Sequence, residues 1–347
     1  MTKKILSVVG ARPQFIKAVP LSRAMAQRAI LIEIMVHTGQ HFDSAMSAVF
    51  FAELGIGEPG YHFDIHGGPH GEMTGRMIVE LERAMLAEKP DAVLVYGDTN
   101  STLAGAIAAA KLYIPIAHVE AGLRSFQAMP EEINRVVTDR VSRWLFCPTA
   151  TAAANLAREG IGAGVHDVGD VMYDAALMMR ERARGRPAMI LARLGLSPGQ
   201  FALATLHRAE NTDTREALQR ALDYLRSVAR TEPVVLPLHP RTRIAAASYG
   251  LDLSGISVIE PVGYLDMMAL LDACTQVLTD SGGLQKEAYF FRKPCITLRN
   301  ATEWVETVDA GWNRLWHGPD YAPRREIAAF GDGHAAEKIA DILAAEV

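Results

Sequence analysis

Short apolar runs rich in β-branched residues alternate with longer stretches of helical periodicity along the whole chain. This alternation predicts parallel sheets covered by helices, which is the α/β class. The expected strands are residues 5–9, 31–37, 92–96, 114–119 and 144–147 in the first half, and 201–206, 234–238, 256–259, 276–278 and 295–298 in the second. Between strands, Met77, Leu81 and Met85 recur at helical spacing, and an alanine-rich helix over residues 103–112 is entered through Thr99.

The repeated rhythm, together with a length of 347 residues, predicts two similar domains of Rossmann-like type. Residues 180–187, Arg-Glu-Arg-Ala-Arg-Gly-Arg-Pro, indicate a charged linker region near the boundary. We place the first domain at residues 1–168, the second at 169–334 and a last helix at 335–347.

Charge and cysteine usage exclude several classes of protein. A formal net charge of −5 gives no general attraction for nucleic acid or an anionic membrane, so an anionic ligand must be a small molecule in a local basic pocket. Cys147, Cys274 and Cys295 are odd in number and form no CxxC pair, which argues against disulfides and zinc. No stretch approaches about 18 apolar residues, and the first apolar run is too short for a signal peptide. We therefore expect a cytoplasmic protein.

Carboxylates follow two strands of the first half, at the sheet edge where ligands bind in such folds. Asp98 comes after residues 92–96 and Glu120 after 114–119, while Glu131 and Glu132 begin a helix soon afterwards. Each also fits a simple role at a helix N-terminus, and we expect one of the two adjacent glutamates to do no more than that. Carboxylates gathered at one edge repel unless some are protonated or paired, as acid and base groups are. The candidate partners are Arg12, Lys17, Arg124 and Arg135.

The first strand runs into Gly10-Ala11-Arg12-Pro13, where Gly10 allows a tight turn and Pro13 suits a first helical turn. The helix N-terminus with Arg12 suits a phosphate, although a capped turn with a solvated arginine explains the same residues.

In the second half, a histidine and an arginine follow each of two strands: His207 with Arg208, and His239 with Arg241. Two such pairs indicate an anion site. After residues 276–278 comes Asp280-Ser281-Gly282-Gly283, in which Ser281 can cap a helix and the glycines allow close approach to a diphosphate. Glu287, one turn into that helix, is placed to accept hydrogen bonds from ribose hydroxyls. The residues thus predict a nucleotide diphosphate on the second half and an acid/base cluster on the first.

Six motifs in order, Gly10-Ala-Arg-Pro13, Gly97-Asp-Thr99, His118-Val-Glu-Ala-Gly-Leu-Arg124, Pro130-Glu-Glu-Ile-Asn-Arg135, His239-Pro240 and Asp280-Ser-Gly-Gly283, resemble the non-hydrolysing UDP-N-acetylglucosamine 2-epimerase family. The resemblance covers nearly the whole chain. It implies the GT-B architecture with an interdomain active site, a final helix that returns to the first domain, a homodimer, and no nicotinamide or metal cofactor.

The resemblance also implies a mechanism for exchanging UDP-GlcNAc and UDP-ManNAc. UDP is eliminated across C1–C2 to give bound 2-acetamidoglucal, and then adds back after a proton reaches the opposite face of C2. Asp98, Glu120 and Glu131 become the acid/base set, with Lys17 and His207 in support. Residues implied for UDP binding are Arg12, Arg135, Arg208, His239, Arg241, Tyr264, Ser281, Gly282, Gly283 and Glu287, with His207 at the diphosphate.

Two details bear on the branch of the family. Residues 37–43, 99–105 and 169–174 are similar to those of UDP-2,3-diacetamido-2,3-dideoxyglucuronate 2-epimerases, which leaves that substrate as an alternative. Gln40 and His41 are followed by Phe42 and Asp43, where members activated by UDP-GlcNAc carry a second glutamine. The resemblance therefore does not extend to allosteric activation.

Other functions fit parts of the pattern. A GT-B glycosyltransferase would share the fold and the diphosphate site, but it needs one base rather than three carboxylates. A hydrolysing epimerase would release a free sugar, and a nucleotide-sugar-binding regulator would bind the substrate without exchanging its C2 proton.

Overall fold

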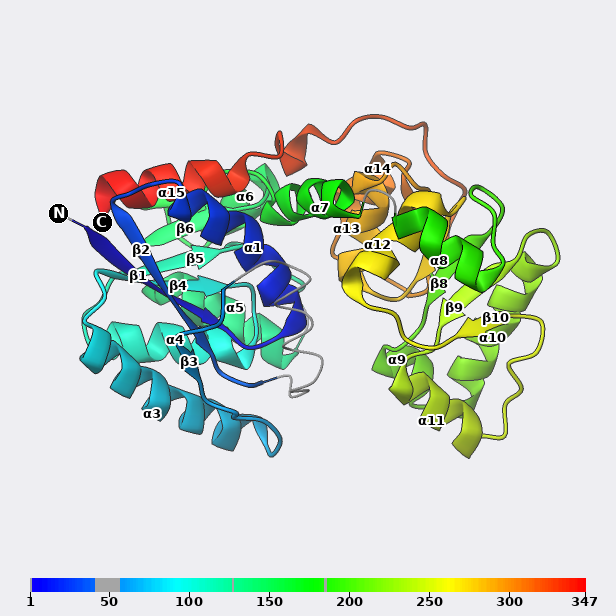
Figure 1. Ribbon diagram of the computed structural model, residues 1–347, viewed down its shortest axis with the longest axis horizontal. Helices are drawn as coiled ribbons and strands as arrows, with labels where there is room; N and C mark the ends of the chain where they lie inside the picture. Colours follow the sequence, from blue (N-terminus) through cyan, green and yellow to red (C-terminus); the bar gives the residue numbers. More distant parts are fainter. Residues whose placement is uncertain (1, 41–56, 127, 184–185) are drawn as a thin grey trace. The chain divides into compact units, whose positions relative to one another are not determined.

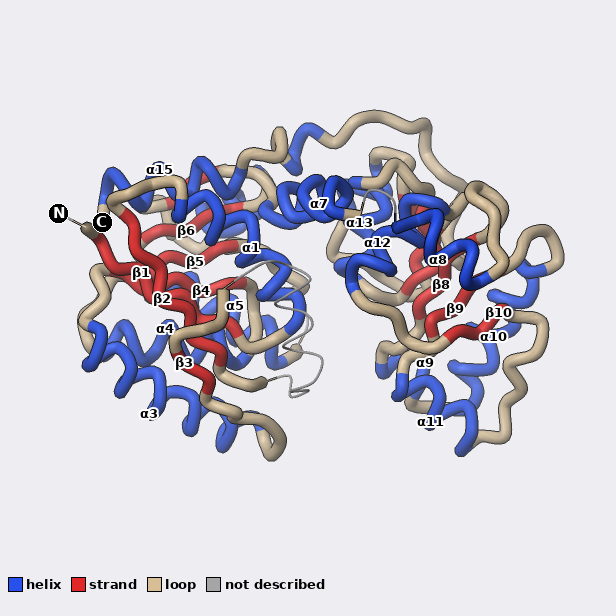
Figure 2. Tube along the Cα trace, in the orientation of Figure 1, coloured by secondary structure: helices blue, strands red, loops and turns tan. Residues whose placement is uncertain are grey.

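The computed structural model describes residues 2–40, 57–126, 128–183 and 186–347. The chain divides into two compact units. Unit 1 comprises Met1–Ala175 and Ala328–Val347, and unit 2 comprises Ala176–Ile327. Each unit contains its own parallel sheet (Figures 1 and 2) and is described by itself.

The sheet of unit 1 has the strand order β3-β2-β1-β4-β5-β6-β7, and its strand pairs are parallel. Its strands are β1 (Lys3–Val9), β2 (Leu31–His37), β3 (Tyr61–His62), β4 (Ala92–Tyr96), β5 (Ile116–Val119), β6 (Trp144–Cys147) and β7 (Val165–Asp167). Its helices are α1 (Arg12–Ala26), α3 (His70–Glu88), α4 (Asn100–Lys111), α5 (Pro130–Val141), α6 (Ala150–Arg158), the start of α7 (Val171–Arg182), the short η1 (Ala328–Phe330) and α15 (Ala335–Glu346). The strand order reverses between β1 and β4, which is where open parallel sheets bind ligands.

Helices cover the sheet of unit 1 on both faces (Figure 1). Apolar residues of α3 and α4, such as Met77, Leu81 and Ala104, pack with Leu6 and Val95 of the sheet in one buried cluster. Successive side chains along a strand point to opposite faces of the sheet, which lets a parallel sheet bury both faces under helices. Helix α4 begins where expected, because the Thr99 hydroxyl accepts the Thr102 N–H as its N-cap.

The last helix, α15, packs against α1 within unit 1 (Figure 1). Arg28, just after α1, hydrogen-bonds Asp341 at 2.8 Å, and the Trp144 indole donates to Glu346 at 2.7 Å. These polar contacts fix the C-terminal segment on the unit that also contains the N-terminus.

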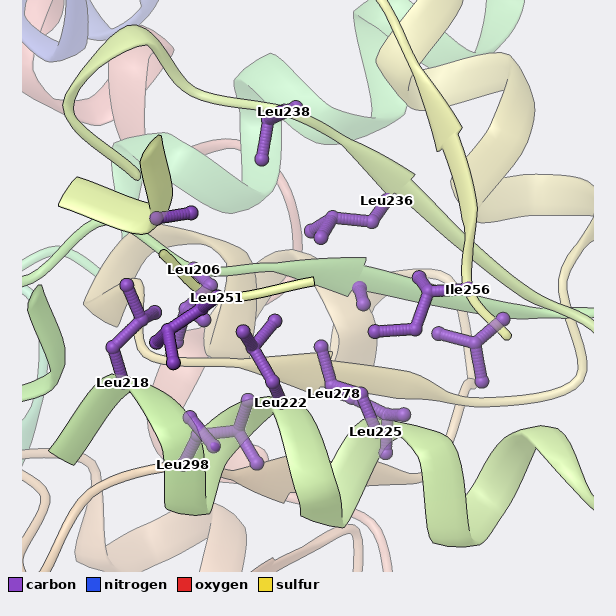
Figure 3. Close-up of a cluster of buried hydrophobic side chains, with 14 of the residues drawn as sticks. Leu206, Leu218, Leu222, Leu225, Leu236, Leu238, Leu251, Ile256, Leu278 and Leu298 are labelled. Carbon is purple, nitrogen blue, oxygen red and sulfur yellow. The ribbon is translucent and has the colours of Figure 1, made fainter. Parts of the chain in front are cut away.

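The sheet of unit 2 has the order β10-β9-β8-β11-β12-β13, which repeats the arrangement of unit 1 with its reversal between β8 and β11. Its strands are β8 (Ala202–Thr205), β9 (Val234–Pro237), β10 (Ser257–Ile259), β11 (Val277–Thr279), β12 (Cys295–Thr297) and β13 (Asn313–Leu315). Its helices are α8 (Arg186–Leu194), α9 (Ala209–Thr212), α10 (Arg215–Ala229), α11 (Pro240–Ser248), α12 (Tyr264–Ala273), α13 (Gly282–Phe290) and α14 (Val305–Asp309). Figure 3 shows Leu218, Leu222 and Leu225 of α10 packed on Leu236 and Leu278 of the sheet.

The predicted α/β fold class is confirmed: in each unit, the strands of one parallel sheet alternate along the chain with helices, and the strand order is typical of Rossmann-like units. The ten predicted strands correspond to β1, β2, β4–β6 and β8–β12, with ends that differ by up to two residues. The prediction missed β3, β7 and β13, which are edge strands of two or three residues and too short to show a period.

The structure corrects the prediction of a linker at residues 180–187. Helix α7 continues to Arg182 and α8 begins at Arg186, so described residues at both ends of this stretch are helical. Arginine and alanine favour helices, and Pro187 is tolerated in a first helical turn. By its contacts the chain divides within α7, after Ala175.

No helix among the described residues is long and apolar enough to span a membrane.

Candidate functional site

The turn after β1 depends on a close approach rather than on an unusual backbone angle. A Cβ at Gly10 would lie 2.1 Å from both the Ser101 and the Thr38 hydroxyl oxygens, so any larger residue would have to displace these buried hydroxyls. The buried Gln14 amide accepts the N–H groups of Gly10 (2.8 Å) and Ala11 (3.0 Å). These two backbone donors are therefore occupied within the protein, and a phosphate at this turn would depend on other groups such as Arg12.

Asp98 lies at the carboxyl end of β4, in the turn that leads to α4. Its carboxylate pairs with the Arg135 guanidinium from α5, and its carbonyl accepts the Asn134 amide at 2.8 Å. Burial raises the pKa of Asp98 above its ordinary value; the positive charges of Arg135 and Lys17 oppose this rise. The negative charges of Glu120 and Glu131 add to it, so the predicted carboxylates act on one another.

Glu120 follows β5 and forms an ion pair with Lys17 of α1; both side chains are 12% exposed. Its backbone has φ = +70°, a left-handed conformation that non-glycine residues adopt rarely and that surrounding contacts must maintain. The Glu120 N–H donates to the Phe146 carbonyl at 3.1 Å, which holds this turn. A Cβ at Gly97 would lie within 3.3 Å of the Lys17 ammonium and the Glu120 carboxylate, so the turn after β4 directly contacts the pair.

The two adjacent glutamates of α5 differ in their surroundings. One Glu132 oxygen accepts from the Ser125 N–H (3.0 Å), the Ser125 hydroxyl (2.9 Å) and Arg135 (2.9 Å). Burial alone would raise the pKa of Glu132, but these hydrogen bonds outweigh it and lower the pKa. Glu132 is thus the glutamate with a structural role, and Glu131 is the one whose charge reaches Asp98.

Arg124 does not pair with the predicted acid/base carboxylates, which corrects its place among their candidate partners. Its guanidinium binds Glu159 in a two-point contact (2.7 and 2.8 Å) and Asp139 at 2.8 Å. Asp139 also contacts the buried His118 ring at 2.7 Å. Burial alone would raise the pKa of Asp139, but His118 and Arg124 outweigh it and hold the pKa below its ordinary value.

In unit 2, Asp280 organises the turn after β8. One of its oxygens accepts the backbone N–H groups of His207 (2.9 Å) and Arg208 (2.8 Å) and the Asn211 amide (3.1 Å). The other lies 3.4 Å from His207 Nδ1. Burial lowers the pKa of His207, and Asp280 partly opposes this. Asp280 is fully buried, whereas the His207 side chain is 32% exposed, so the ring is held on its inner side.

The predicted diphosphate turn has the expected cap, since the Ser281 hydroxyl accepts the Leu284 N–H at 3.5 Å at the start of α13. A Cβ at Gly282 would lie 2.3 Å from a Glu303 carboxylate oxygen, so a larger residue there would displace the end of the Glu303 side chain. Further along α13, Glu287 is 6% exposed and accepts the Tyr264 hydroxyl at 2.8 Å.

His239 and Arg241, the second predicted histidine–arginine pair, contact nearby residues of unit 2. His239 caps α11 by accepting the Arg241 N–H at 3.2 Å, and its ring centre lies 5.2 Å from that of His207. The Arg241 guanidinium contacts Asp213 at 2.5 Å and Thr212 at 2.9 Å. The two histidines therefore come together, while Arg241 has partners of its own.

In unit 1, the structure brings together Lys17, Asp98, Glu120 and Arg135, and the charge of Glu131 acts on Asp98. In unit 2, the rings of His207 and His239 lie together, and Ser281 follows β11. Residues that the sequence analysis did not single out are Gln14, Asp139, Asn134, Asn211 and Asp280 as an orienting group. Their signal is a polar residue inside a buried helix face or strand end, which needs the structure to be recognised. Residues 41–43 lie outside the described residues, and within the described ranges no group of three or more His, Cys, Asp or Glu side chains could hold a metal.

Chemically, unit 1 supplies carboxylates in two states. Asp98 holds its proton more readily than an ordinary aspartate, and Glu120 faces an ammonium. Such a division suits the removal of a proton at one position and its return at another.

Residues 23–344 match the sequence model of a family described as UDP-N-acetylglucosamine 2-epimerase. A Pseudomonas aeruginosa protein named UDP-2,3-diacetamido-2,3-dideoxy-D-glucuronate 2-epimerase is 57% identical over 318 residues, which cover 90% of this chain and 88% of that protein. A Methanococcus maripaludis protein named UDP-N-acetylglucosamine 2-epimerase homolog is 48% identical, with 98% of this chain and 99% of that protein covered.

Among solved structures, the chain is similar to Methanocaldococcus jannaschii UDP-GlcNAc 2-epimerase in complex with UDP-GlcNAc and UDP. The TM-score is 0.86 at 39% identity, and the match covers 98% of each chain.

Proposed function

Because this chain belongs to the UDP-N-acetylglucosamine 2-epimerase family, we propose that it inverts C2 of a UDP-2-acetamido sugar by eliminating UDP and adding it back. The resemblance that the sequence motifs carry is confirmed by these matches. The chain is a UDP-sugar 2-epimerase, an isomerase, as its relatives are named.

The observation that carries the mechanism is that two carboxylates in unit 1 each pair with a cationic side chain, Glu120 with Lys17 and Asp98 with Arg135. Glu120, charged against Lys17, is our choice for the base that takes the C2 proton. As the C1–O bond breaks, its electron pair goes to the diphosphate, the C2–H electron pair forms the C1–C2 double bond, and a bound 2-acetamidoglycal remains. Asp98, whose pKa burial raises, is our choice for the acid on the other face of C2.

Glu131 completes the proposed acid/base set through its charge, which acts on Asp98. In unit 2, we assign His207 and the Ser281–Gly283 turn to the diphosphate. A donor aimed at the leaving diphosphate stabilises the charge that develops on it. Glu287, fixed by Tyr264, is assigned to the ribose.

Two substrates remained open from the sequence, and the comparisons favour the alternative. The relative named for UDP-2,3-diacetamido-2,3-dideoxy-D-glucuronate is 57% identical, whereas those from Methanococcus maripaludis and Methanocaldococcus jannaschii that are named UDP-N-acetylglucosamine 2-epimerase are 40% and 39% identical. We therefore propose the diacetamido uronate as the preferred substrate and UDP-GlcNAc as a poorer one.

The test is incubation with each UDP-sugar in D₂O, followed by NMR of the products. We expect the C2-inverted UDP-sugar with deuterium at C2, and a higher kcat/KM for the diacetamido uronate. Inversion without solvent deuterium would contradict the proposed proton removal. Release of a free sugar would instead indicate a hydrolysing enzyme, and binding without turnover a regulator.

A further inference from the structure

The side chain of His118 connects the two turns that carry Asp98 and Glu120. It lies on β5, two residues before Glu120, and is fully buried. Nε2 is 2.8 Å from the Gly97 carbonyl, in the turn that continues into Asp98. Nδ1 is 2.7 Å from Asp139 Oδ1.

Both of these partners can only accept. A carbonyl oxygen has no proton to give, and the Asp139 carboxylate is paired with the always-charged Arg124 guanidinium at 2.8 Å and accepts the Gly122 N–H, both of which favour its ionised form. A neutral imidazole has one N–H, so it would leave one of these short contacts between two lone pairs. Two hydrogen bonds require two N–H groups, and therefore a positively charged ring.

If the His118 ring is positively charged, the positive and negative side chains around it are also equal in number. Arg124 and Asp139 are buried, and Glu159 is 30% exposed at the end of their chain of contacts. With a charged His118 the group contains two positive and two negative side chains. Buried charges are tolerated when they are paired in this way.

Asp139 extends the connection to the turn of Glu120. Its second oxygen accepts the Gly122 N–H at 3.2 Å and Arg124 at 2.8 Å, just beyond Glu120 in sequence. Glu120 itself has φ = +70°, a conformation that surrounding contacts must maintain. His118 thus anchors Gly97 on one side and, through Asp139, the strained turn on the other.

We propose that His118 is a positioning residue for Asp98 and Glu120: a buried imidazolium that donates from both ring nitrogens and fixes the two carboxylate turns relative to each other. It acts through the turns and does not contact the substrate. The kinetic part of the test rests on the proposed function, whereas the protonation of the ring does not.

The first measurement is ¹⁵N NMR of the imidazole rings in the wild-type protein, with and without UDP. We expect two protonated nitrogens on His118 near neutral pH, because both of its partners can only accept. Asp139 from α5 is the titratable group that contacts the ring, and Arg124 and Glu159 follow it in the same chain of contacts. Cys147 of β6, whose thiol pKa burial raises to about 12, interacts with Asp139 through its charge. A single N–H on His118 near neutral pH would overturn the proposal, whatever the activity.

The second measurement uses His118→Gln and His118→Asn, whose amide nitrogens can replace Nε2 and Nδ1 respectively. The first variant keeps the bond to Gly97 and loses the one to Asp139; the second does the opposite. We expect kcat to fall on the order of 10- to 100-fold in each, because small misplacements of catalytic groups cost that much. The Kd for UDP should change little, since most of the residues assigned to UDP, such as His207 and Glu287, lie in unit 2.

His166→Gln is the matched control, because His166 lies on β7, where its ring packs against Phe146. We expect wild-type kcat from this variant. Circular dichroism and the UDP Kd identify variants that fail to fold. Folded His118 variants with wild-type kcat would also overturn the proposal, and equal losses in His166→Gln would show that the effect is not specific to His118.

Discussion

Lys17 and Glu120 form an ion pair beside Gly97, at the edge of the unit 1 sheet where the strand order reverses. The two residues come from α1 and from the turn after β5, which are distant in sequence. Glycine at position 97 is favoured by its left-handed backbone, φ = +62°, and a Cβ there would also lie 3.2 Å from Glu120 Oε2 and 3.3 Å from Lys17 Nζ.

We expect Asp98→Asn, Glu120→Gln and Glu131→Gln each to lower kcat at least about 100-fold. An amide at position 98 or 120 cannot exchange the C2 proton, and Glu131→Gln removes the charge that acts on Asp98. Turnover of the preferred UDP-sugar, followed by NMR, measures this. Glu72→Gln is the control: Glu72 also lies in the first turn of a helix, and removing its charge should cost only a fraction of a kilocalorie per mole of stability. Full activity in all three carboxamide variants would refute the acid/base assignment.

Asp98, Glu120 and Glu131 could be found from the sequence because they follow strands or open a helix, and strand ends meet at one edge of a parallel sheet. Their pairing could not be found in the same way. Arg124 and Arg135 lie equally near these carboxylates in sequence, but α5 directs Arg135 to Asp98, while Arg124 turns to Asp139 and Glu159. The direction of a side chain depends on the packing of its helix, which spacing along the chain does not report.

The strands show the same limit. β2, β4 and β6 are runs of apolar residues and were predicted with their observed ends. β13 reads Asn313-Arg314-Leu315 and is a strand because β12 offers it an edge to pair with. Such an edge strand is fixed by its neighbour more than by its own composition.

For unit 2, we expect His207→Gln to reduce kcat/KM by about 2–4 kcal/mol of transition-state stabilisation, as loss of a donor to a developing anion does. Steady-state kinetics with the UDP-sugar measures this. His317→Gln serves as the control, because His317 is an exposed histidine of the same unit that stacks on Trp316. Equal kcat/KM for the wild type and His207→Gln would remove His207 from the diphosphate site.

Gly10→Ala should destabilise the protein by about 1–3 kcal/mol, because its Cβ would meet the Ser101 and Thr38 hydroxyl oxygens at 2.1 Å. Urea unfolding measures the change. Gly75→Ala provides the opposite case: Gly75 lies inside α3, and apart from its chain neighbours and the backbone of the helix itself no heavy atom of the described residues comes within 4 Å of its Cβ position. That variant should gain about 0.5–1 kcal/mol. A Gly10→Ala protein as stable as wild type would show that the turn relaxes freely.

Stability should fall on acidification partly through His37. Burial lowers its pKa from 6.5 to about 4, with the nearby His62 adding to the shift and Asp64 opposing it. The unfolded chain therefore takes up a proton below about pH 6.5, while the folded protein does so only near pH 4. This contribution is complete above pH 6.5 and is lost as the pH falls to 4, by about 3 kcal/mol at most.

Urea unfolding of the wild type and His37→Gln across that pH range measures this contribution. The variant starts less stable because a buried ring is removed, but its stability should depend less on pH between 6.5 and 4. Parallel pH profiles of the two proteins would mean that His37 titrates normally in the folded state.

Asp174 should show the opposite dependence. It lies in α7, is 7% exposed, and accepts the Ala336 N–H at 2.7 Å at the start of α15. Burial raises its pKa from 3.8 to about 6, although the backbone N–H groups of α15 oppose the rise. Between these values the folded protein holds a proton that the unfolded chain has released, so stability decreases as the pH rises from 3.8 to 6, and the cost persists at neutral pH.

Asp174→Asn keeps an oxygen for the Ala336 N–H and removes the buried charge. We therefore expect a gain of about 1–3 kcal/mol at about pH 8, falling towards zero near pH 4, where the wild-type carboxyl is already protonated. Asp167→Asn, at an exposed position on β7, is the control and should change stability little at either pH. Urea unfolding at both pH values distinguishes the cases. A loss of stability at pH 8 would show that the Asp174 charge is favourable at the N-terminus of α15, and that its interaction with this helix outweighs the cost of burial.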